Sequence, residues 1–325
     1  MKRKIISLLL AVVLLLFVTI ACDNRNDSAN GQVTTAFSVN FIDVGQGDSI
    51  FINFGDGKCM LIDTGYTDKN VCSNIINVIK AYSVENIDYL VLTHPDLDHV
   101  GNSIEIIDNF SIGKACLPYI INTSLIEDYA KILNKLKDKK IETVTSVINQ
   151  TIRGDDYILM FLSPLPFNNP ESSYFDYNFQ PFPTAEQTNN LSPIIYLEYK
   201  GVSFVFTGDA GVSQEKLVLK NYEVNYYNKV LGEEKIHLEN IDFLKVAHHG
   251  SKDCSSKDFL NLLCPNNAVI SVGGSNNYGH PSLTTIENLL LSNKDCKILR
   301  TDRDGTISVG VDKNSEITIQ TQGVR

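Results

Sequence analysis

The sequence predicts an α/β protein in which two mixed β-sheets pack together and carry helices on the outside. Segments with the pattern of strands are interspersed with segments of helical period, and this happens in two successive sets along the chain. The 325 residues and the 43% hydrophobic content suffice for one sizeable core. Because no boundary or low-complexity segment interrupts residues 37–325, we expect them to form one domain.

The first set of elements covers residues 37–162. Strands are expected at 37–43, 49–54, 58–63, 87–93 and 157–162. The second and third of these are joined by Gly55-Asp56-Gly57, which is a strong hairpin signal. Helices are expected at 70–82, after the 94–99 loop, and on both sides of Pro118, with a clear helical period at 124–138.

The segment 163–184 separates the two sets and is rich in Pro, Asn, Phe and Tyr. We expect a long ordered loop of the kind that borders an active site, with a plain surface insertion as the alternative. In the second set, helices are expected near 212–220 and 282–292. Strands are expected at 193–199, 202–207, 241–247, 267–272, 297–301, 305–310 and 316–320.

The N-terminus predicts export. Lys2-Arg3-Lys4 precedes the apolar run 5–20, which has the length of a signal-peptide core. The run ends in Thr19-Ile20-Ala21-Cys22, which resembles a bacterial lipobox, although Thr19 replaces the usual leucine. We expect residues 1–22 to be a signal peptide with Cys22 as the lipidated residue, and 23–36 to be a flexible linker. The protein would then lie on the outer face of the cytoplasmic membrane; a plain signal peptide with secretion, or an uncleaved anchor, is the alternative.

Six further cysteines are scattered along the chain without any CxxC pair, and most lie in apolar runs. We expect buried free thiols, with disulfides as the alternative in an exported protein. The net charge is -10, and it becomes about -13 without Lys2, Arg3 and Lys4. Such a surface repels polyanions, so a nucleic-acid substrate has to be held by metals and local lysines. The basic cluster between Lys131 and Lys140 is read as the wet face of a helix, and no protein partner is inferred.

The hexapeptide His94-Pro95-Asp96-Leu97-Asp98-His99 directly follows the predicted strand that ends at Thr93. It places four potential metal ligands in one tight loop, and imidazole and carboxylate groups bind zinc, manganese and iron. The alternative is a solvated acidic loop that caps the following helix, since Asp98 is a good N-cap residue. The hexapeptide therefore predicts a metal site only together with other segments.

Four other apolar strands also end in polar or glycine-rich clusters. These are Leu61–Gly65, Phe204–Asp209, Phe243–Ser251 and Val269–Gly274. Functional sites in layered α/β proteins form at the ends of strands. Solvated turn residues explain any one cluster, but five of them in one chain favour a shared site.

On these motifs the chain resembles the metallo-β-lactamase superfamily and, within it, the soluble hydrolase domain of DNA-uptake proteins of the ComEC family. The resemblance extends from about Ser38 to Val311. It is carried by Phe41–Ser49, Leu61–Gly65, Thr93–Gly101, Asn190–Ser192, Thr207–Asp209, Leu244–Ser251, Tyr278–Pro281 and Arg300–Asp302. The motifs are specific for the superfamily and not for a substrate.

The resemblance implies an αββα sandwich that binds one or two divalent ions, zinc or manganese. It implies a set of metal ligands: His94 and Asp96 for one ion, Asp98 and His99 for the other, a bridging Asp209, and one histidine of the His248–His249 pair, for which we favour His249. Asp63 is implied as a residue that orients the ligand loop. Asp96 stands where most of the superfamily has a second histidine, and Asn190 or Ser192 lies near the place of another missing histidine.

The resemblance also implies catalytic roles around a metal-activated water. We favour His248 as the acid that protonates the leaving group, by resemblance to phosphocholine esterases with the same His-His-Gly. Lys245 is predicted to steady a phosphate, or alternatively to lie on the outer strand face. His280 is expected at the rim of the site, or as an ordinary turn histidine. Four residues are assigned to substrate binding: Asn190, Ser192, Ser251 and His280.

Three functions follow as hypotheses. The first is an extracytoplasmic phosphodiesterase or nuclease like the ComEC hydrolase domain, with DNA as a possible substrate. The second is an esterase that releases phosphocholine or cleaves related phosphodiesters of the cell envelope. The third is a non-catalytic surface lipoprotein with the same fold, which retention of the ligand set disfavours. Hydrolysis of β-lactams is disfavoured because the missing histidines build the zinc site used for it.

Overall fold

Two β-sheets, of eight and seven strands, organise the protein in the computed structural model. The structure describes residues 37–123, 126–180, 183–232 and 235–323. The predicted signal peptide, Cys22 and the linker, residues 1–36, lie outside the described residues. Among those that are described, no helix is both long and apolar enough to cross a bilayer.

The first sheet has the order β15-β14-β1-β2-β3-β4-β5-β6. Its strands are β1 (Phe37–Phe41), β2 (Ile50–Asn53), β3 (Cys59–Ile62), β4 (Asn86–Val91), β5 (Ser111–Leu117), β6 (Glu142–Thr145), β14 (Ile307–Val311) and β15 (Ile317–Thr321). Pairing is antiparallel from β15 to β3 and parallel from β3 to β6. The sheet is therefore mixed, as predicted.

The second sheet has the order β13-β12-β11-β10-β9-β8-β7. Its strands are β7 (Thr151–Arg153), β8 (Tyr157–Phe161), β9 (Ile195–Tyr199), β10 (Val202–Phe206), β11 (Phe243–Lys245), β12 (Asn267–Ile270) and β13 (Lys297–Arg300). Pairing is antiparallel from β7 to β10 and parallel from β10 to β13. Each sheet thus has one parallel half, and the carboxyl ends of parallel strands are where α/β proteins place their sites.

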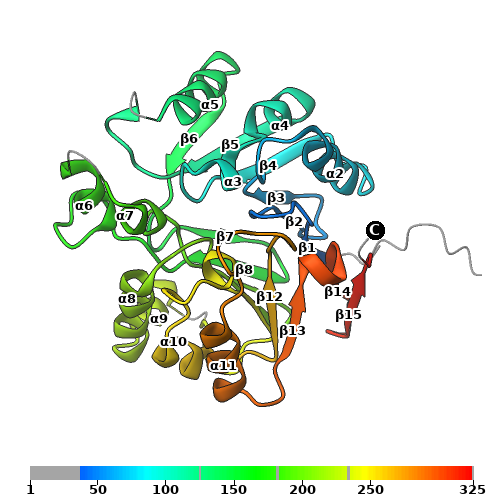
Figure 1. The fold of residues 1–325 in the computed structure, drawn as a ribbon, viewed down its shortest axis with the longest axis vertical. Helices are drawn as coiled ribbons and strands as arrows, with labels where there is room; N and C mark the ends of the chain where they lie inside the picture. The colour runs from blue at the N-terminus through cyan, green and yellow to red at the C-terminus, as the bar shows by residue number, and fades with distance from the viewer. Residues whose placement is uncertain (1–36, 124–125, 181–182, 233–234, 324–325) are drawn as a thin grey trace, which may run out of the picture. The chain divides into compact units, whose positions relative to one another are not determined.

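Helices connect and cover the strands (Figure 1). They are α2 (Lys69–Lys80), α3 (Leu97–Val100), α4 (Ser103–Asn109), α5 (Glu127–Asp138), α6 (Ser173–Phe179), α7 (Ala185–Asn189), α8 (Val212–Glu223), α9 (Tyr226–Leu231), the 3-10 helix η2 (Ala247–Gly250), α10 (Lys257–Leu263), α11 (Leu283–Ser292) and α12 (Thr301–Asp304). Helix α2 shows how a side chain fixes the start of a helix. The carboxylate of Asp68 caps it by accepting hydrogen bonds from the backbone N–H groups of Asn70 and Val71.

Three hydrophobic clusters define the layers. One cluster lies between the sheets, where Phe37 stacks on Tyr199 with ring centroids 4.2 Å apart and Phe54 stacks on Tyr157 at 4.4 Å. A second cluster joins the first sheet to α2, α4 and α5, and a third joins the second sheet to α8, α10 and α11. The order helix, sheet, sheet, helix confirms the predicted αββα sandwich.

Most predicted elements are confirmed within a few residues, and the differences are local. The strands β5, β6 and β7 and the helices α7, α9, η2, α10 and α12 were not predicted. The segment 163–184 is not a continuous loop, because it contains α6. The basic cluster lies on α5 and its end, where Lys135 and Lys139 contact Asp108 at 2.5 and 3.2 Å, so it is a helix face as expected.

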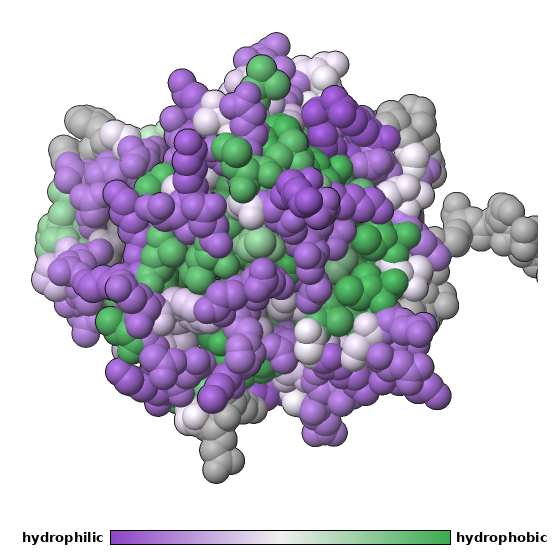
Figure 2. Space-filling view, turned by 90° about the horizontal axis from the view of Figure 1, so that it is seen from below, coloured by the Kyte–Doolittle hydropathy of each residue, from purple (hydrophilic) through white to green (hydrophobic). Residues whose placement is uncertain are grey.

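The six cysteines of the described part are free thiols, as predicted. Five are buried and Cys264 is partly exposed. Burial raises the pKa of Cys59 to about 11 and that of Cys116 to about 12. Apolar surface is also present outside the core: Figure 2 shows apolar patches among hydrophilic side chains on the face seen from below in Figure 1. Large exposed apolar side chains include Leu291 of α11, which is 73% exposed.

Candidate metal centre

Residues that follow strands of both sheets meet at one place. From the first sheet, β4 leads into the loop that carries His94, and α3 directly afterwards carries His99. From the second sheet, β10 leads to Asp209 and β11 leads to η2 with its two histidines. The predicted strand-end clusters therefore converge, except that 269–274 contributes backbone rather than side chains.

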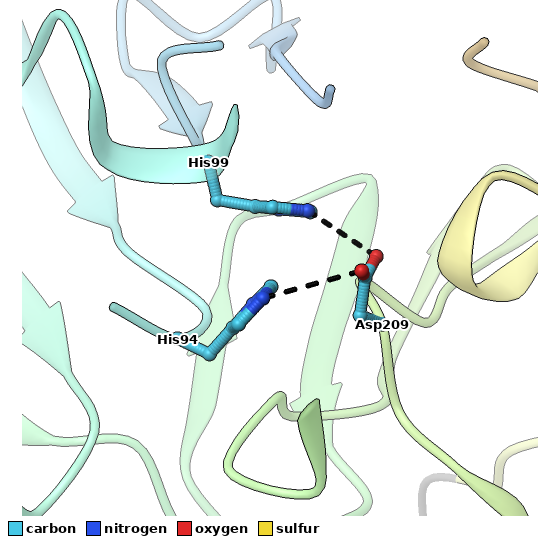
Figure 3. A group of neighbouring side chains, drawn as sticks. All are labelled: His94, His99 and Asp209. Carbon is cyan, nitrogen blue, oxygen red and sulfur yellow. Dashed lines mark ion pairs between the residues drawn. The ribbon is translucent and has the colours of Figure 1, made fainter. Parts of the chain in front are cut away.

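His94, His99 and Asp209 form the centre of this site (Figure 3). The Nε2 atom of His94 lies 4.0 Å from Asp209 Oδ2, and the Nε2 atom of His99 lies 3.3 Å from Asp209 Oδ1. All three side chains are buried. The two imidazoles thus approach one carboxylate from the opposite sheet, each with the same ring nitrogen.

A second group adjoins the first through His99. The Nε2 atom of His249 lies 3.4 Å from Asp98 Oδ2 and 3.7 Å from Asp209 Oδ2. Asp98, His99 and His249 offer ligand atoms that all lie within 4.8 Å of one another. Asp209 therefore stands between the His94 side and the His249 side, which is the position that a bridging carboxylate occupies.

Asp96 lies at the open side of the cluster. Its Oδ2 atom is 3.7 Å from His94 Nε2, and its side chain is 46% exposed. The other carboxylates of the cluster are more enclosed: the Asp98 side chain is 31% exposed and that of Asp209 is 3% exposed. Solvent and substrate therefore reach the cluster beside Asp96.

The donor atoms fit a metal ion because they lack other partners. Among the described residues, the Nε2 atoms of His94, His99 and His249 and the Oδ1 atom of Asp209 are buried without a hydrogen bond. Buried polar atoms are almost always paired in folded proteins, so four unpaired atoms that converge on one place indicate a missing partner. Nitrogen and carboxylate donors at this spacing suit a divalent transition ion.

The Nδ1 atoms of the three imidazoles contact protein groups on the side away from Asp209. These contacts turn each Nε2 atom toward the metal centre. Asp63 Oδ2 lies 2.8 Å from His99 Nδ1, and Asp63 also accepts bonds from the N–H and hydroxyl of Thr93 at 2.8 and 2.7 Å. The carbonyl of Ser271 lies 2.9 Å from His249 Nδ1. Such partners fix the tautomer and the direction of a ligating imidazole. Asp63 is thus placed where the predicted orienting residue has to be.

Asp48 and Lys245 form an ion pair behind His249. The Lys245 ammonium lies 2.7 Å from Asp48 Oδ2, and His249 Nδ1 lies 3.5 Å from Asp48 Oδ1. Both partners are essentially inaccessible to solvent. Burial alone would raise the pKa of Asp48, but Lys245 and then His249 hold it below its ordinary value. The pair links the loop after β1 to strand β11 and so ties the two sheets together beside the ligands.

The two neighbouring histidines face different environments. Both have left-handed backbone conformations, with φ of 47° at His248 and 54° at His249. This sharp turn buries His249 and leaves His248 30% exposed, with its Nε2 3.6 Å from Asp209 Oδ2. The Nδ1 atom of His248 lies 3.4 Å from the side-chain amide of Asn189. The arrangement supports His249 as the ligand and His248 as the residue that meets substrate.

The electrostatics of the cluster favour bound cations. Burial lowers the pKa of His94 to about 4, so its imidazole is neutral and available as a donor at neutral pH. Burial opposes ionisation of Asp209, yet His99 and His249 hold its pKa well below the usual range. Conversely, burial disfavours the charged form of His249, but Asp209, Asp48 and Asp98 raise its pKa to about 9. The buried carboxylates therefore stabilise positive charge at this place, as the binding of a cation requires.

Several predicted site residues lie elsewhere than expected. Lys245 is neither on an outer face nor open to a phosphate, because Asp48 and the Val246 carbonyl occupy its buried ammonium. Ser192 lies behind the ligands, with its hydroxyl 3.2 Å from His94 Nδ1 and accepting a bond from the Asp209 N–H. Asn190 accepts a bond from the Gly211 N–H. These three residues support the site and do not line it.

Ser251 is likewise buried, and its hydroxyl accepts a bond from the Asp253 N–H within its own turn. His280, in contrast, lies at the rim as predicted: its ring centroid is 5.4 Å from that of His248. His280 is partly buried, and burial together with His248 and His249 lowers its pKa to about 4. Of the residues assigned to substrate binding, His280 is therefore the one placed beside the open histidine.

Three contributors were missed. Asp48 belongs to the Phe41–Ser49 motif, whose resemblance was noted without any role for its carboxylate. Asn189 immediately precedes the assigned Asn190 and contacts His248 instead of it. Thr93 ends the strand before the ligand loop and binds Asp63. A polar residue at the end of an apolar strand was the available signal for Thr93, and the pattern gave no signal for Asn189.

The sequence matches the Metallo-beta-lactamase superfamily over residues 42–274. It is similar to ComE operon protein 3 of Bacillus subtilis (strain 168), with 28% identity over 83% of this chain and 32% of that protein. It is also similar to Competence protein ComA of Neisseria gonorrhoeae, with 27% identity over 83% of this chain and 31% of that protein. The chain thus spans about a third of the length of these curated relatives.

Solved structures with a similar fold include two metalloproteins. CmlA, a diiron beta-hydroxylase from Streptomyces venezuelae, is 15% identical, with a TM-score of 0.49 over 81% of this chain and 52% of that one. Igni18, a metallo hydrolase from Ignicoccus hospitalis, is 14% identical, with a TM-score of 0.48 over 83% of this chain and 98% of that one.

Proposed function

Because the chain belongs to the metallo-β-lactamase superfamily, we propose that this metal-dependent hydrolase cleaves phosphodiester bonds and that its substrate is nucleic acid. One observation carries the proposal: Asp209 stands between His94, His99 and His249, whose buried Nε2 atoms make no hydrogen bond among the described residues. The relatives named for competence support DNA as the substrate.

Members of this fold family bind one or two metal ions, and here we assign zinc or manganese to His94, Asp96, Asp98, His99, Asp209 and His249. Bound there, the ions would supply Lewis acidity and an activated water. Asp63, Ser192 and Ser271 keep the imidazoles aimed at the centre. His248, at the open side, holds a proton at Nε2 and delivers it to the departing oxygen of the substrate. Asn189 keeps the other nitrogen of that ring in place.

The charge of the protein limits how a phosphodiester is held. The net charge is -10, and Lys245, which lies beside the ligands, is occupied by Asp48. Phosphate contacts by surface lysines, which normally dominate affinity for nucleic acid, are therefore few. The scissile phosphate would be bound by the ions themselves and approached by His248 and His280.

A small phosphodiester such as phosphocholine on an envelope polymer is the second candidate. The acidic surface favours it, because such a substrate needs no basic groove. The third candidate is a surface protein that has the same fold but no catalytic activity. This candidate leaves the assembled set of metal ligands without a catalytic role. The same assay separates all three.

The decisive experiment offers the purified protein, loaded with manganese or zinc, a panel of substrates. These are single-stranded DNA, bis(p-nitrophenyl) phosphate, p-nitrophenyl phosphocholine and nitrocefin. We expect cleavage of the first two, loss of at least about 100-fold in rate with Asp209→Ala, and no loss with the exposed control Asp295→Ala. Release of p-nitrophenol from the phosphocholine substrate without DNA cleavage would favour the second candidate, and inactivity toward all four substrates would favour the third.

We further propose that the chain is exported and anchored to the outer face of the cytoplasmic membrane through a lipid on Cys22. The proposal rests on Lys2-Arg3-Lys4, the apolar run 5–20 and the lipobox-like Thr19–Cys22. Membrane fractions of cells that express the full chain should contain the protein, and Cys22→Ala should release it or leave its precursor unprocessed. Incorporation of labelled fatty acid into the wild-type chain but not into Cys22→Ala completes the test; equal labelling of both would contradict it.

A further inference from the structure

Four aromatic rings form a cluster beside the metal centre. Tyr119 lies 4.6 Å from Phe167, Phe175 lies 4.5 Å from Phe179, and Phe167 lies 6.2 and 6.1 Å from Phe175 and Phe179, all between ring centroids. We call these four residues the aromatic platform. Phe179 is 63% exposed and Tyr119 is 37% exposed. Large aromatic side chains are normally buried, so a group of them with exposed rings indicates a binding surface.

The topology places the platform next to the ligand loop. Tyr119 follows strand β5, which pairs in parallel with β4, the strand that leads to His94. Because parallel strands end at the same edge of a sheet, the two loops are neighbours. The N–H of Leu92, two residues before His94, donates to the carbonyl of Cys116, three residues before Tyr119, at 3.0 Å. The loop that carries Tyr119 therefore starts beside the ligand loop of the metal centre.

The platform is held in place by hydrogen bonds. The side chain of Asn178 donates to the Tyr119 carbonyl at 2.8 Å and accepts from the Ile121 N–H at 2.6 Å. The buried Tyr174 donates from its hydroxyl to the Ser146 carbonyl. Helix α6 is thus tied to the loop after β5 and to the loop after β6. The exposed rings are presented by an anchored helix, which reduces the entropy lost when a ligand binds.

We propose that the aromatic platform binds the bases of a single-stranded nucleic acid by stacking, while the adjoining phosphodiester lies at the metal centre. This inference rests on the proposed function and adds how the substrate is recognised. Every nucleobase has a flat face, so stacking on aromatic rings holds a strand without preference for sequence. It also provides affinity in a protein whose charge repels phosphates.

The segments that carry the platform offer no cation of their own to a phosphate group, and Lys220 of α8, which lies 3.9 Å from Glu171, is paired with that carboxylate. Residues 115–126 contain no charged side chain, and residues 163–189 contain no lysine, arginine or histidine but include Glu171, Asp176 and Glu186. Strand affinity that arises here therefore depends only weakly on salt. With two or fewer phosphate contacts, binding of a single strand should weaken by less than about tenfold between 50 and 200 mM salt.

The ring angles favour a flat base over a quaternary ammonium group. The angles between ring planes are 37° for Tyr119 and Phe167, 35° for Phe167 and Phe175, 36° for Phe175 and Phe179, and 7° for Phe167 and Phe179. Phe167 and Phe179 are nearly parallel and the other three pairs are tilted by 35° to 37°, so no ring stands edge-on to its neighbour. A cage for an ammonium group surrounds the cation with several ring faces. The geometry therefore points away from choline as the group bound at this place.

The first test compares two substrates of different size. In the full-length, metal-loaded protein, Phe179→Ala should raise KM for oligo(dT) by roughly 5- to 150-fold, the effect of one lost base stack. It should raise KM for bis(p-nitrophenyl) phosphate far less than KM for oligo(dT), because that small substrate binds chiefly at the metal centre and offers no row of bases to stack. Leu291→Ala, at an exposed apolar residue of α11, is the matched control and should change neither. If the wild type cleaves neither substrate, the proposed function fails; if it cleaves both and Phe179→Ala leaves KM for oligo(dT) unchanged, the stacking proposal fails.

The second test detects stacking directly and does not depend on turnover. The chain contains no tryptophan, so Phe179→Trp introduces a single fluorophore on the platform and Leu291→Trp introduces one on α11. Oligo(dT) should quench the first and not the second, and an abasic oligonucleotide of equal length should quench neither. Quenching by the abasic strand would assign binding to the phosphates, and quenching by choline but not by oligo(dT) would assign the platform to an ammonium group; either result overturns the proposal.

Discussion

At the scale of single residues, the metal centre depends on side chains that support the ligands from behind. Asp63 and Thr93 hold His99, Ser192 adjoins His94, and Asp48 with Lys245 lies behind His249. Each contact fixes one ring, because an imidazole with its Nδ1 atom occupied can present only Nε2 to a cation. The ligands are therefore preorganised by the protein before any ion arrives.

The buried pair of Asp48 and Lys245 gives a sharp prediction. Asp48→Ala leaves the Lys245 ammonium buried without its partner, and we expect a loss of about 3–5 kcal/mol in the free energy of unfolding. The double variant Asp48→Ala/Lys245→Met removes both charges and should recover part of that loss. Urea denaturation followed by circular dichroism measures both values. A double variant that is less stable than the single one would show that the ion pair is not the source of the effect.

The sequence placed the candidate ligands together more readily than it placed the residues that support them. His94, Asp98, His99, Asp209 and His249 stand in short motifs at strand ends, and strand ends meet at one edge in this class of fold. The assignments of Lys245, Ser192 and Ser251 failed because a residue's place in a motif does not tell whether its side chain faces substrate or the protein interior. That distinction depends on the segments packed against the residue, as the enclosure of Lys245 by Asp48 from a loop of the other sheet shows.

At the scale of elements, the turn between β1 and β2 is packed against the ligand loop. Gly47 has a φ of 140°, and a β-carbon at this position would collide with the carbonyl oxygen of Asp98. The N–H of Asp48 donates to that same carbonyl at 3.1 Å. The turn therefore supports the loop that carries Asp98 and His99. A glycine is required at position 47 because the two backbones approach closely there.

Replacement of this glycine tests the contact. Gly47→Ala should lower the free energy of unfolding by about 1–3 kcal/mol more than Gly57→Ala, and should weaken metal binding as well. Gly57 is the matched control because its φ of 91° is also positive, while a β-carbon there meets nothing within 4 Å. Unfolding titrations and metal competition with a chelating dye measure the two effects. Equal losses in both variants would mean that backbone strain, and not the contact with Asp98, accounts for the change.

The elements that escaped prediction share a physical cause. Strands β6 and β7 have four and three residues and form the edges of the two sheets, so their side chains are half exposed and lack a strong apolar pattern. The apolar sequence pattern of strand β5 is interrupted by Gly113 and Lys114. In the segment 163–184, prolines and asparagines indicated a loop, whereas Ser172 caps the short helix α6 by accepting a bond from the Tyr174 N–H. Most central strands, although short, were predicted well because both of their faces are buried.

At the scale of the whole molecule, the metal centre joins the two halves of the sandwich. His94 and His99 follow a strand of the first sheet, whereas Asp209 and His249 follow strands of the second. A cation bound by all four would connect the sheets at the edge where the hydrophobic core between them ends. We therefore expect metal binding to stabilise the entire fold and not just its loops.

Removal of metal tests this coupling. At a free ion concentration about 100 times Kd, binding should contribute about 2.7 kcal/mol of stability, so a chelator should lower Tm by roughly 5–10 °C. Differential scanning calorimetry with and without chelator measures the change. Asp209→Ala should melt at the same temperature in both conditions, because it lacks the central carboxylate. A chelator effect that persists in this variant would place the stabilising ion at another site.

The enclosure of the thiols has a consequence if the chain is exported to the outer face of the cytoplasmic membrane, as proposed above. Sulfhydryl groups are oxidised there, and an unpaired set of six invites cross-links between wrong partners or neighbouring molecules. Burial keeps most of these sulfurs protonated and out of reach of oxidants once the sandwich has closed. On the proposed export route, oxidation of these thiols would be confined to the interval between translocation and completion of folding, and rapid folding would protect the chain without covalent bridges.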